Sequence, residues 1–282
     1  MDKSKNILIR LQAGFLISST RLQSGLFRQL VCLACLLILG SAINAQQESK
    51  RPWTLRLGAS YVEVMEQQIS KLVGQGPSLH ATLTKSYPGE EWDGELELQL
   101  AAGLPKTDFE SGYRSVMPSL SARYRLTKTI ETGDANAFHI GGFGQAIFRN
   151  NYYKNLDQSR FYWTNFLGIG LSAGFDRELS DGRTLFAGLD LPLIGGKARP
   201  PRNRYYRIDD ISFGRLFKNN FSNMSLGAVN TYFNPSFTAG LRFAGKRIQA
   251  LSYFFEYCNV KDEDIIYRQV NHGLALTIKL GK

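Results

Sequence analysis

Cysteine, histidine and long hydrophobic runs are all scarce in this sequence. Its 282 residues include only 3 Cys and 3 His. Three cysteines supply neither a disulfide scaffold nor a zinc site with four cysteine ligands. The apolar run over residues 31–39 is too short for a membrane-spanning helix, which needs about 20 residues, and no other stretch is long and apolar enough. The sequence therefore excludes a helical membrane protein.

The composition is that of a folded chain with an excess of basic residues. Hydrophobic residues make up 43% and aromatic residues 12%, which is too much for a disordered chain. The formal net charge is +10. A total charge does not say where the charge lies, so it does not by itself indicate a nucleic-acid partner.

The first 45 residues have the order of parts typical of a secretory signal peptide. Arg21 and Arg28 precede the apolar run at 31–39, and small residues then lead to Ala45. We expect cleavage after Ala45, with 46–282 as the mature protein. Cys32 and Cys35 leave with the signal, so their spacing is not read as a redox or metal motif. Cys258 is then the only cysteine of the mature chain.

The mature chain alternates apolar and polar residues with the period of two that is typical of β-strands. In residues 94–104 the apolar positions are Leu96, Leu98, Leu100, Ala102 and Leu104. Glu95, Glu97 and Gln99 lie between them on the other face. The same pattern recurs over 118–126, 160–176 and the last segment of the chain.

Period two predicts strands but leaves two architectures open. A soluble sandwich buries its apolar face, whereas a transmembrane barrel turns that face toward lipid and keeps a polar lumen. The predicted strands are longer than the globular average of about five or six residues, and several carry charge in mid-strand. Aromatic residues also collect near strand ends, as in the interfacial girdles of membrane barrels. They include Trp53, Tyr61, Phe161, Trp163, Phe175, Tyr253 and Tyr257. These features favour a transmembrane antiparallel up-and-down β-barrel.

We predict ten strands. They cover 53–65, 78–86, 93–104, 115–126, 136–149, 160–175, 183–195, 234–244, 249–260 and 267–280. An even number suits a bacterial barrel with both termini on the periplasmic side. Eight strands result if weak strands merge, and twelve if the stretch 196–233 hides two more. Connections at 87–92, 127–135, 177–182 and 245–248 are expected to be periplasmic, and those at 66–77, 105–114, 150–159, 196–233 and 261–266 to be external.

The last strand has a polar-x-Gly-x-x-apolar-x-apolar pattern at Asn271, Gly273, Leu276 and Ile278. With the signal peptide and the glycine-rich amphipathic strands, the chain resembles a small bacterial outer-membrane β-barrel protein of the "outer membrane protein beta-barrel" grouping frequent in Bacteroidota. The resemblance implies an outer-membrane location and recognition of these four residues by the barrel-assembly machinery. The terminal aromatic residue usual in such proteins is missing, since the chain ends in Leu280-Gly281-Lys282. The resemblance implies no particular activity.

Opposite charges on neighbouring predicted strands indicate ion pairs in the lumen. Glu95 and Glu97 are expected to face Arg123 and Arg125 inside a narrow tube, where unpaired charges are costly. Paired charges would plug the lumen, and a selectivity ring in a small pore is the alternative. We favour the plug because pairing uses up the charges that would attract an ion.

The stretch 196–233 is expected to be a long outer loop with a basic and aromatic surface. Its predicted anion- or partner-binding residues are Lys197, Arg199, Arg202, Arg204, Tyr205, Tyr206, Arg207, Arg215 and Lys218. Arginine suits contact with phosphates, and aromatic rings supply stacking area. For an exported chain, lipopolysaccharide or an acidic cell-envelope protein fits better than nucleic acid. A solvated loop without a ligand is an equal alternative.

Little in the sequence indicates catalysis. His80 and His139 are expected to face the lumen and His272 the lipid, and no motif of a known barrel enzyme is present. Two imidazoles without a carboxylate partner make no convincing metal site, and Cys258 is expected to pack in the lumen. We therefore expect no enzyme, no metal and no cofactor. The expectation is a barrel with a structural or surface-binding role. A narrow channel and a barrel enzyme acting on lipid or peptide are the alternatives.

Overall fold

The fold is seen in a computed structural model. It describes residues 53–69, 71–107, 114–132, 135–154, 161–200, 224–245, 247–262 and 264–280. All of them belong to the compact unit Ser49–Lys282. The predicted signal peptide, 1–45, lies outside the described residues and stays a prediction. None of the described residues forms a helix of the length and apolarity that crossing a bilayer requires.

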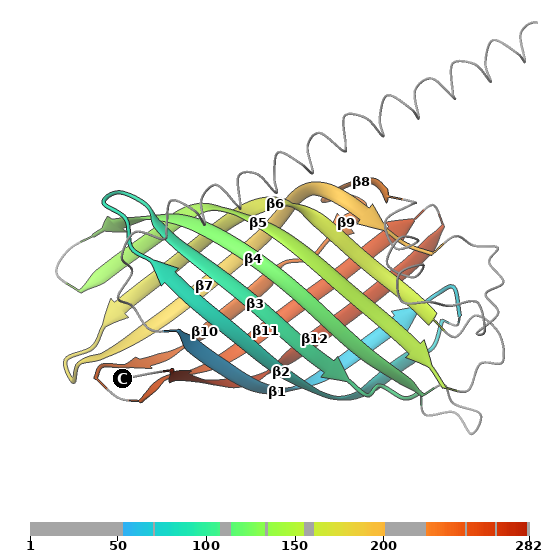
Figure 1. The fold of residues 1–282 in the computed structure, drawn as a ribbon, viewed down its shortest axis with the longest axis horizontal. Coiled ribbons are helices and arrows are strands. Elements are labelled where there is room, and N and C mark those ends of the chain that lie inside the picture. The colour runs from blue at the N-terminus through green and yellow to red at the C-terminus, as the bar shows by residue number, and fades with distance from the viewer. Residues whose placement is uncertain are drawn as a thin grey trace, which may run out of the picture. The chain divides into compact units, whose positions relative to one another are not determined.

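Ten strands form the wall of a closed barrel (Figure 1). They are β1 (Thr54–Glu66), β2 (Val73–Tyr87), β3 (Asp93–Gly103), β4 (Ser115–Glu131), β5 (Asn136–Tyr153), β6 (Phe161–Glu178), β7 (Arg183–Ala198), β10 (Ser236–Phe243), β11 (Ile248–Asp262) and β12 (Ile265–Lys279). Two short strands, β8 (Met224–Ala228) and β9 (Tyr232–Phe233), are attached to this wall.

Antiparallel pairing runs around the whole circle. Each strand from β1 to β7 pairs with the next, β7 pairs with β10, and β12 pairs with β1 from Thr54↔Lys279 to Glu66↔Tyr267. The predicted number of ten is confirmed, and the alternatives of eight and twelve are wrong. The stretch 196–233 does contain two further strands. However, β8 and β9 lie between β7 and β11, as β10 does, so they do not raise the number of strands around the barrel.

The apolar face points outward and the polar face inward. Large exposed side chains recur on alternate positions of the wall, among them Leu79, Leu100, Leu120, Ile140, Leu171, Leu189, Leu251 and Leu274. Polar side chains such as His80, Thr82, Gln145, Asp190 and Asn271 are less than a tenth exposed. A sandwich would bury the apolar set, so the soluble alternative is wrong and the chain has the surface of a transmembrane barrel.

The barrel has two different ends. We call the end with the connections 88–92, 132–135, 179–182 and 244–247 the turn end. There Gly182 and Gly245 have positive φ angles of 77° and 69°, which side chains rarely adopt. We call the other end, with the connections 67–72, 104–114, 154–160, 199–223 and 263–264, the loop end. Both the start of β1 and the end of β12 lie at the turn end (Figure 1).

Three strands, β10, β8 and β9, occupy the space between β7 and β11. β10 pairs with Arg183–Asp190 of β7 and with Ala250–Glu256 of β11. Toward the loop end, β8 takes over the pairing with β7, and β9 the pairing with β11. Pro192 lies between the two sections of β7, where no partner strand needs its missing N–H.

A β-bulge explains an error in the predicted loop boundary. The register between β6 and β7 shifts between Ile169 and Gly170, so that Leu193 is the extra residue. Asp190 points inward before the bulge, and Lys197 points inward after it. The strand continues to Ala198, so the expected loop start at 196 is wrong.

The aromatic girdle was predicted only in part. Tyr61 is 42% and Tyr253 is 40% exposed on the outer surface. Trp163 shares the face of Phe161 and Tyr152, but it is only 2% exposed, so its side chain is covered.

Candidate functional site in the lumen

The turn-end half of the lumen is an open cavity of about 750 Å³. Its wall includes Thr84, His139, Asp176 and Arg242, and its floor includes Glu97. Arg242 holds Asp176 through Nη1 and Oδ2 at 2.6 Å, and His139 Nε2 lies 3.4 Å from the same oxygen. His139 therefore has a carboxylate partner, and the expectation that it lacks one was wrong.

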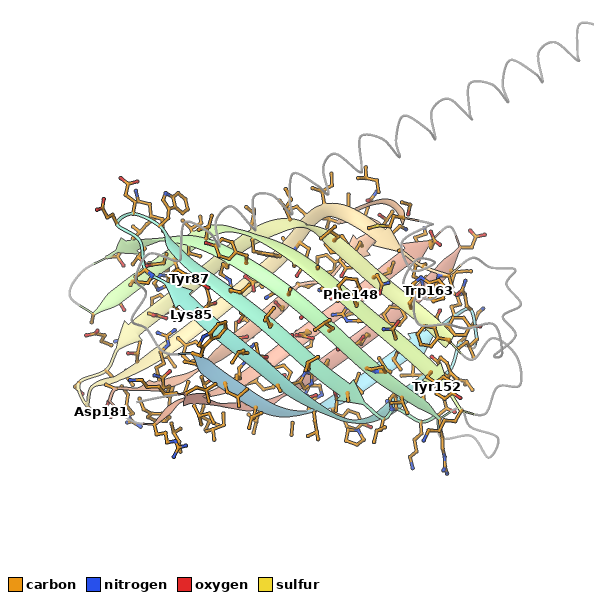
Figure 2. All side chains as sticks on the ribbon, in the orientation of Figure 1. Lys85, Tyr87, Phe148, Tyr152, Trp163 and Asp181 are labelled. Carbon is orange, nitrogen blue, oxygen red and sulfur yellow. The ribbon has the colours of Figure 1, made fainter. Side chains whose placement is uncertain are left out.

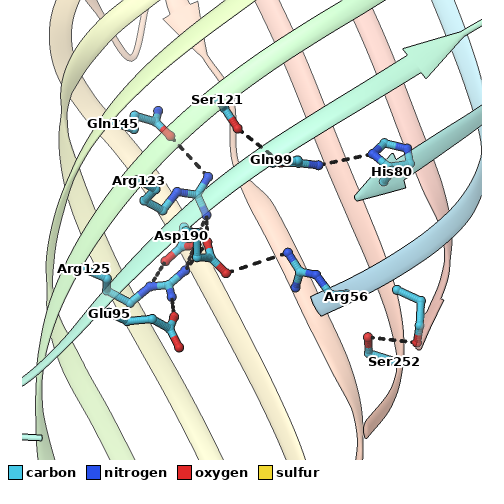
Figure 3. A network of polar contacts seen from close by, with 12 residues as sticks. Arg56, His80, Glu95, Gln99, Ser121, Arg123, Arg125, Gln145, Asp190 and Ser252 are labelled. Carbon is cyan, nitrogen blue, oxygen red and sulfur yellow. Dashed lines mark hydrogen bonds and ion pairs between the residues drawn. The ribbon is translucent and has the colours of Figure 1, made fainter. Parts of the chain in front are cut away.

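The floor of this cavity is a charge cluster, which we define as Arg56, Glu95, Glu97, Arg123, Arg125 and Asp190 (Figure 3). The structure brings together the four charges expected from β3 and β4. Arg125 contacts Glu95, and Glu97 Oε2 lies 3.6 Å from Arg125 Nη2 and 3.8 Å from Arg123 Nη1. Arg56 of β1 adds a fifth member at 3.8 Å from Glu97. The cluster holds three guanidinium groups and three carboxylates, so its formal charges cancel.

Asp190 is the central member of the cluster, and sequence reasoning missed it. It comes from β7, across the lumen from β4, and is 6% exposed. Its Oδ2 lies 2.5 Å from Arg123 Nη1 and 2.7 Å from Arg125 Nη2, and Ser172 Oγ donates to Oδ1 at 2.6 Å. Only closure of the barrel shows which cations Asp190 meets, because β7 and β4 are not consecutive strands.

A second polar network surrounds His80, deeper in the lumen (Figure 3). Ser60 Oγ lies 2.6 Å from His80 Nε2, and Gln99 Nε2 lies 3.2 Å from Nδ1. The fold thus makes a serine–histidine pair that was not visible in the sequence, because the two residues lie on the neighbouring strands β1 and β2. The cavities beside His80 measure only about 40 and 50 Å³. They have room for a few water molecules and not for a substrate.

The lumen is closed toward the loop end. An apolar cluster made of Val62, Val64, Met117, Phe166, Tyr232, Cys258, Val260 and Tyr267 fills it. Cys258 is 1% exposed within this cluster, so the expectation that it packs in the lumen is confirmed.

A buried ion pair lies beside the apolar cluster. Arg199 Nη2 lies 2.6 Å from Glu66 Oε1, and its Nη1 donates to Glu66 Oε2 at 3.0 Å and to Thr164 Oγ1 at 2.6 Å. Both charged side chains are at most 5% exposed. Because Glu66 ends β1 and Arg199 follows β7, this pair ties two distant parts of the wall together across the lumen.

Two residues expected to bind anions from an outer loop are therefore buried. Lys197 donates to the backbone oxygen of Lys261 and lies 3.4 Å from Asp262 Oδ1. Arg199 is occupied by Glu66. Both predictions were wrong because the bulge in β7 carries these residues inside. The other proposed loop residues, Arg202, Arg204, Tyr205, Tyr206, Arg207, Arg215 and Lys218, lie outside the described residues.

The four residues of the proposed assembly signal lie on β12 with local packing roles. Asn271 is 2% exposed, and its Nδ2 lies 3.3 Å from His80 Nε2. A Cβ on Gly273 would lie 2.2 Å from the backbone oxygen of Ala59. Leu276 is 38% exposed on the outer face, and Ile278 pairs with Leu55 of β1. Within the described residues, no group of three or more His, Cys, Asp or Glu side chains is placed to hold a metal ion.

The closed circle of strands, the apolar exterior and the polar interior define the chain as a transmembrane β-barrel. No known family model matches the sequence, and no curated protein matches it.

Solved structures of similar overall fold have low sequence identity. The translocator domain of the autotransporter NalP from Neisseria meningitidis is 9% identical over 89% of this chain and 98% of its own, with a TM-score of 0.38. The outer membrane protease OmpT from Escherichia coli is 6% identical over 84% and 100%, with a TM-score of 0.44. An outer membrane channel from Pseudomonas putida F1 is 9% identical over 83% and 97%, with a TM-score of 0.36. At these values the similarities carry no argument about function.

Proposed function

We propose that this chain is an outer-membrane β-barrel with a non-conducting lumen, which displays the segment 201–223 at the loop end to bind an anionic surface or partner. The observation that carries the proposal is the closure of the lumen by Glu66, Arg199 and the apolar cluster. A barrel closed in this way acts through what it presents at its rim.

The outer-membrane location is supported by the physics of the wall. A closed antiparallel barrel satisfies its backbone hydrogen bonds internally, and its exterior is apolar on alternate positions. The predicted signal peptide would deliver the chain to the bacterial envelope. The barrel-assembly machinery, reading Asn271, Gly273, Leu276 and Ile278, would then insert it.

Conductance across a planar bilayer tests the closed lumen. The refolded full-length barrel is expected to produce no stable, salt-dependent current steps. The double variant Glu66→Ala/Arg199→Ala removes the buried pair and serves as the comparison. Stable steps from the unmodified protein would overturn the proposal.

A narrow channel for small solutes is the second candidate. It is favoured by the series of cavities along the lumen, because the turn-end cavity and the smaller one beyond it share Arg56, Glu97 and Asp190 as lining residues. The same recording distinguishes the two candidates. In a channel, Asp190→Asn would change the ion preference of the current, whereas a closed barrel has no current to change.

The displayed segment is tested by a deletion that spares the buried pair. Ala198 of β7 pairs with Met224 of β8, so residues on both sides of the deletion already lie together. Removing 201–218 is expected to leave heat-modifiable migration of the folded barrel unchanged and to reduce its retention on immobilised lipopolysaccharide. Loss of folding would show that the segment supports the barrel, and unchanged retention would contradict a binding role.

The proposal assigns no reaction to Ser60 and His80. A nucleophile needs space for the group that it attacks, and the neighbouring cavities are too small for one. The pair instead joins β1 to β2 inside the barrel.

A further inference from the structure

Three basic side chains form a registered row on the outside of the barrel at the loop end. We define the basic row as Lys106, Arg114 and Lys154. Lys106 and Arg114 are antiparallel bridge partners, and the Lys154 backbone N–H donates to the Arg114 oxygen at 2.9 Å. The row therefore crosses the ends of β3, β4 and β5 without a break.

The alternation of the three strands directs the row outward. Ser115 and Tyr153, next to Arg114 and Lys154 in the chain, are 4% and 6% exposed and face the interior. Directly paired residues of antiparallel strands share one face. Consistent with this, all three basic residues are exposed.

The row lies directly beyond the apolar surface of the barrel. Leu104 is 55% exposed and lies two residues before Lys106, while Tyr152 is 39% exposed and lies two residues before Lys154. Figure 2 shows Tyr152 near the loop end. Two residues of a strand cover about 6–7 Å. The charges therefore lie just beyond the lipid-facing apolar side chains, at the depth of the lipid headgroups.

The geometry concentrates positive charge. Neighbouring strands are about 4.8 Å apart, so three cationic groups gather along about 10 Å of the rim. Like charges on directly opposed residues destabilise a sheet. None of the three forms an ion pair with another of the residues that the structure describes. The arrangement is suited to an external anion that two or three side chains share.

The two ends of the barrel differ in exposed charge. In the described part of the loop end, Lys71, Lys261 and Arg268 are also exposed, and Asp264 is the exposed acidic residue. At the turn end, basic and acidic exposed residues balance, as with Arg177 and Glu178. The positive excess thus lies on the side that we propose to face the outer leaflet.

We infer that the basic row binds the phosphate groups of a membrane lipid in the leaflet around the loop end. This inference rests on the proposed outer-membrane location and deepens it by naming a lipid site on the wall, apart from the segment 201–223. The lipid is favoured over a free anion because Leu104 and Tyr152 offer its acyl chains an adjoining apolar surface. Arg114, in the centre, can contact a phosphate through two N–H groups while the lysines act as point charges.

The test uses the refolded full-length barrel with the variant Lys106→Gln/Arg114→Gln/Lys154→Gln. The matched control, Lys128→Gln/Arg177→Gln/Arg247→Gln, removes the same charge from exposed positions at the turn end. Native mass spectrometry of the detergent-solubilised barrel measures the binding of lipid A. Dephosphorylated lipid A and inorganic phosphate are the comparison ligands.

Each basic contact with an anionic lipid surface strengthens attachment about fivefold. The loop-end variant is therefore expected to lose lipid A binding by at least tenfold, and the turn-end control to keep it. Dephosphorylated lipid A is expected to bind the unmodified barrel weakly. Equal loss in both variants, or equal binding of both lipids, would overturn the inference. Competition by millimolar inorganic phosphate as strong as that by lipid A would show a free-anion site and overturn it too.

A variant with a single substitution controls for a folding defect of the triple variant. Arg114→Gln alone is expected to weaken lipid A binding about fivefold with unchanged heat-modifiable migration. Unchanged binding in that folded variant would also overturn the inference. The bilayer recordings are independent of these residues. A negative result for the lipid site therefore leaves the proposal of a closed lumen unaffected, and a conducting lumen leaves the lipid site unaffected.

Discussion

At the scale of single residues, the buried pair of Glu66 and Arg199 has a large energetic consequence. A buried ion pair contributes little net stability relative to apolar residues, but removing one partner leaves an uncompensated charge. Here the guanidinium donates to both carboxylate oxygens and also to Thr164. Its ring contact with Tyr267, at 5.2 Å from the centroid, further restricts it.

We therefore predict that Arg199→Met destabilises the barrel by about 3–5 kcal/mol. The double variant Glu66→Leu/Arg199→Met is expected to recover most of that loss, because neither residue of the pair then leaves an unpaired charge behind. Urea unfolding of the barrel in lipid vesicles, followed by tryptophan fluorescence, measures both. A double variant as unstable as the single one would contradict this account.

An exposed ion pair provides the matched comparison. Arg183 and Asp181 lie at the turn between β6 and β7, and hydrogen bonds from Arg183 hold the pKa of Asp181 below its ordinary value. Both side chains are nearly half exposed, and water screens such pairs. Arg183→Gln is expected to leave the unfolding midpoint unchanged.

At the scale of elements, both residues of the short strand β9 make aromatic contacts, and that of Tyr232 is the closer one. Tyr232 stacks on Phe166 of β6 with ring centroids 3.8 Å apart and planes within 3°. Tyr232 is 2% exposed. Because β9 has only two residues, its backbone pairing with β11 cannot hold it in place alone.

Tyr232→Ala is accordingly expected to cost about 3 kcal/mol, measured by the same urea unfolding. Tyr232→Phe keeps the stacked ring and is expected to stay close to the unmodified protein. An alanine variant of unchanged stability would show that the wall section formed by β8 and β9 does not contribute to the fold.

The elements also show how far sequence reasoning reaches. Alternation found all ten wall strands, since a strand between lipid and a polar lumen must repeat every two residues. The sequence pattern also predicted the contact between Glu95 and Arg125, because consecutive strands are neighbours in an up-and-down barrel. It missed Asp190, whose partners lie across the lumen, and the closeness of Ser60 to His80. The bulge at Leu193 reverses the alternation in β7, which is why Lys197 and Arg199 looked like loop residues.

At the scale of the whole molecule, the barrel is open at one end and closed at the other. The turn-end cavity is lined by Thr84 of β2, whereas Met117 of β4 lies in the apolar cluster and is 6% exposed. A reagent that enters the lumen from the turn end thus reaches Thr84 and does not reach Met117.

We predict that Thr84→Cys, in a Cys258→Ala background, reacts with a membrane-impermeant maleimide only after the outer membrane is permeabilised. Met117→Cys in the same background is expected to stay unlabelled in both conditions. Labelling of the cysteine at position 84 in intact cells would mean that the turn end faces outward and would reverse the proposed orientation.

The way in which β8, β9 and β10 complete the wall between β7 and β11 has a consequence for the covalent chain. All wall strands belong to one closed sheet, which can be divided into β1–β7 and β10–β12; these two groups of strands pair with each other at β7–β10 and at β12–β1. The only chain connection between the two groups runs through 199–235. A cut within 201–223 would leave the described pairing within both groups of strands intact, whereas the pairing of β8 with β7 would then join two separate fragments. The barrel is thus divisible into two complementary fragments, and co-refolding them would regenerate a closed wall from two separate polypeptides.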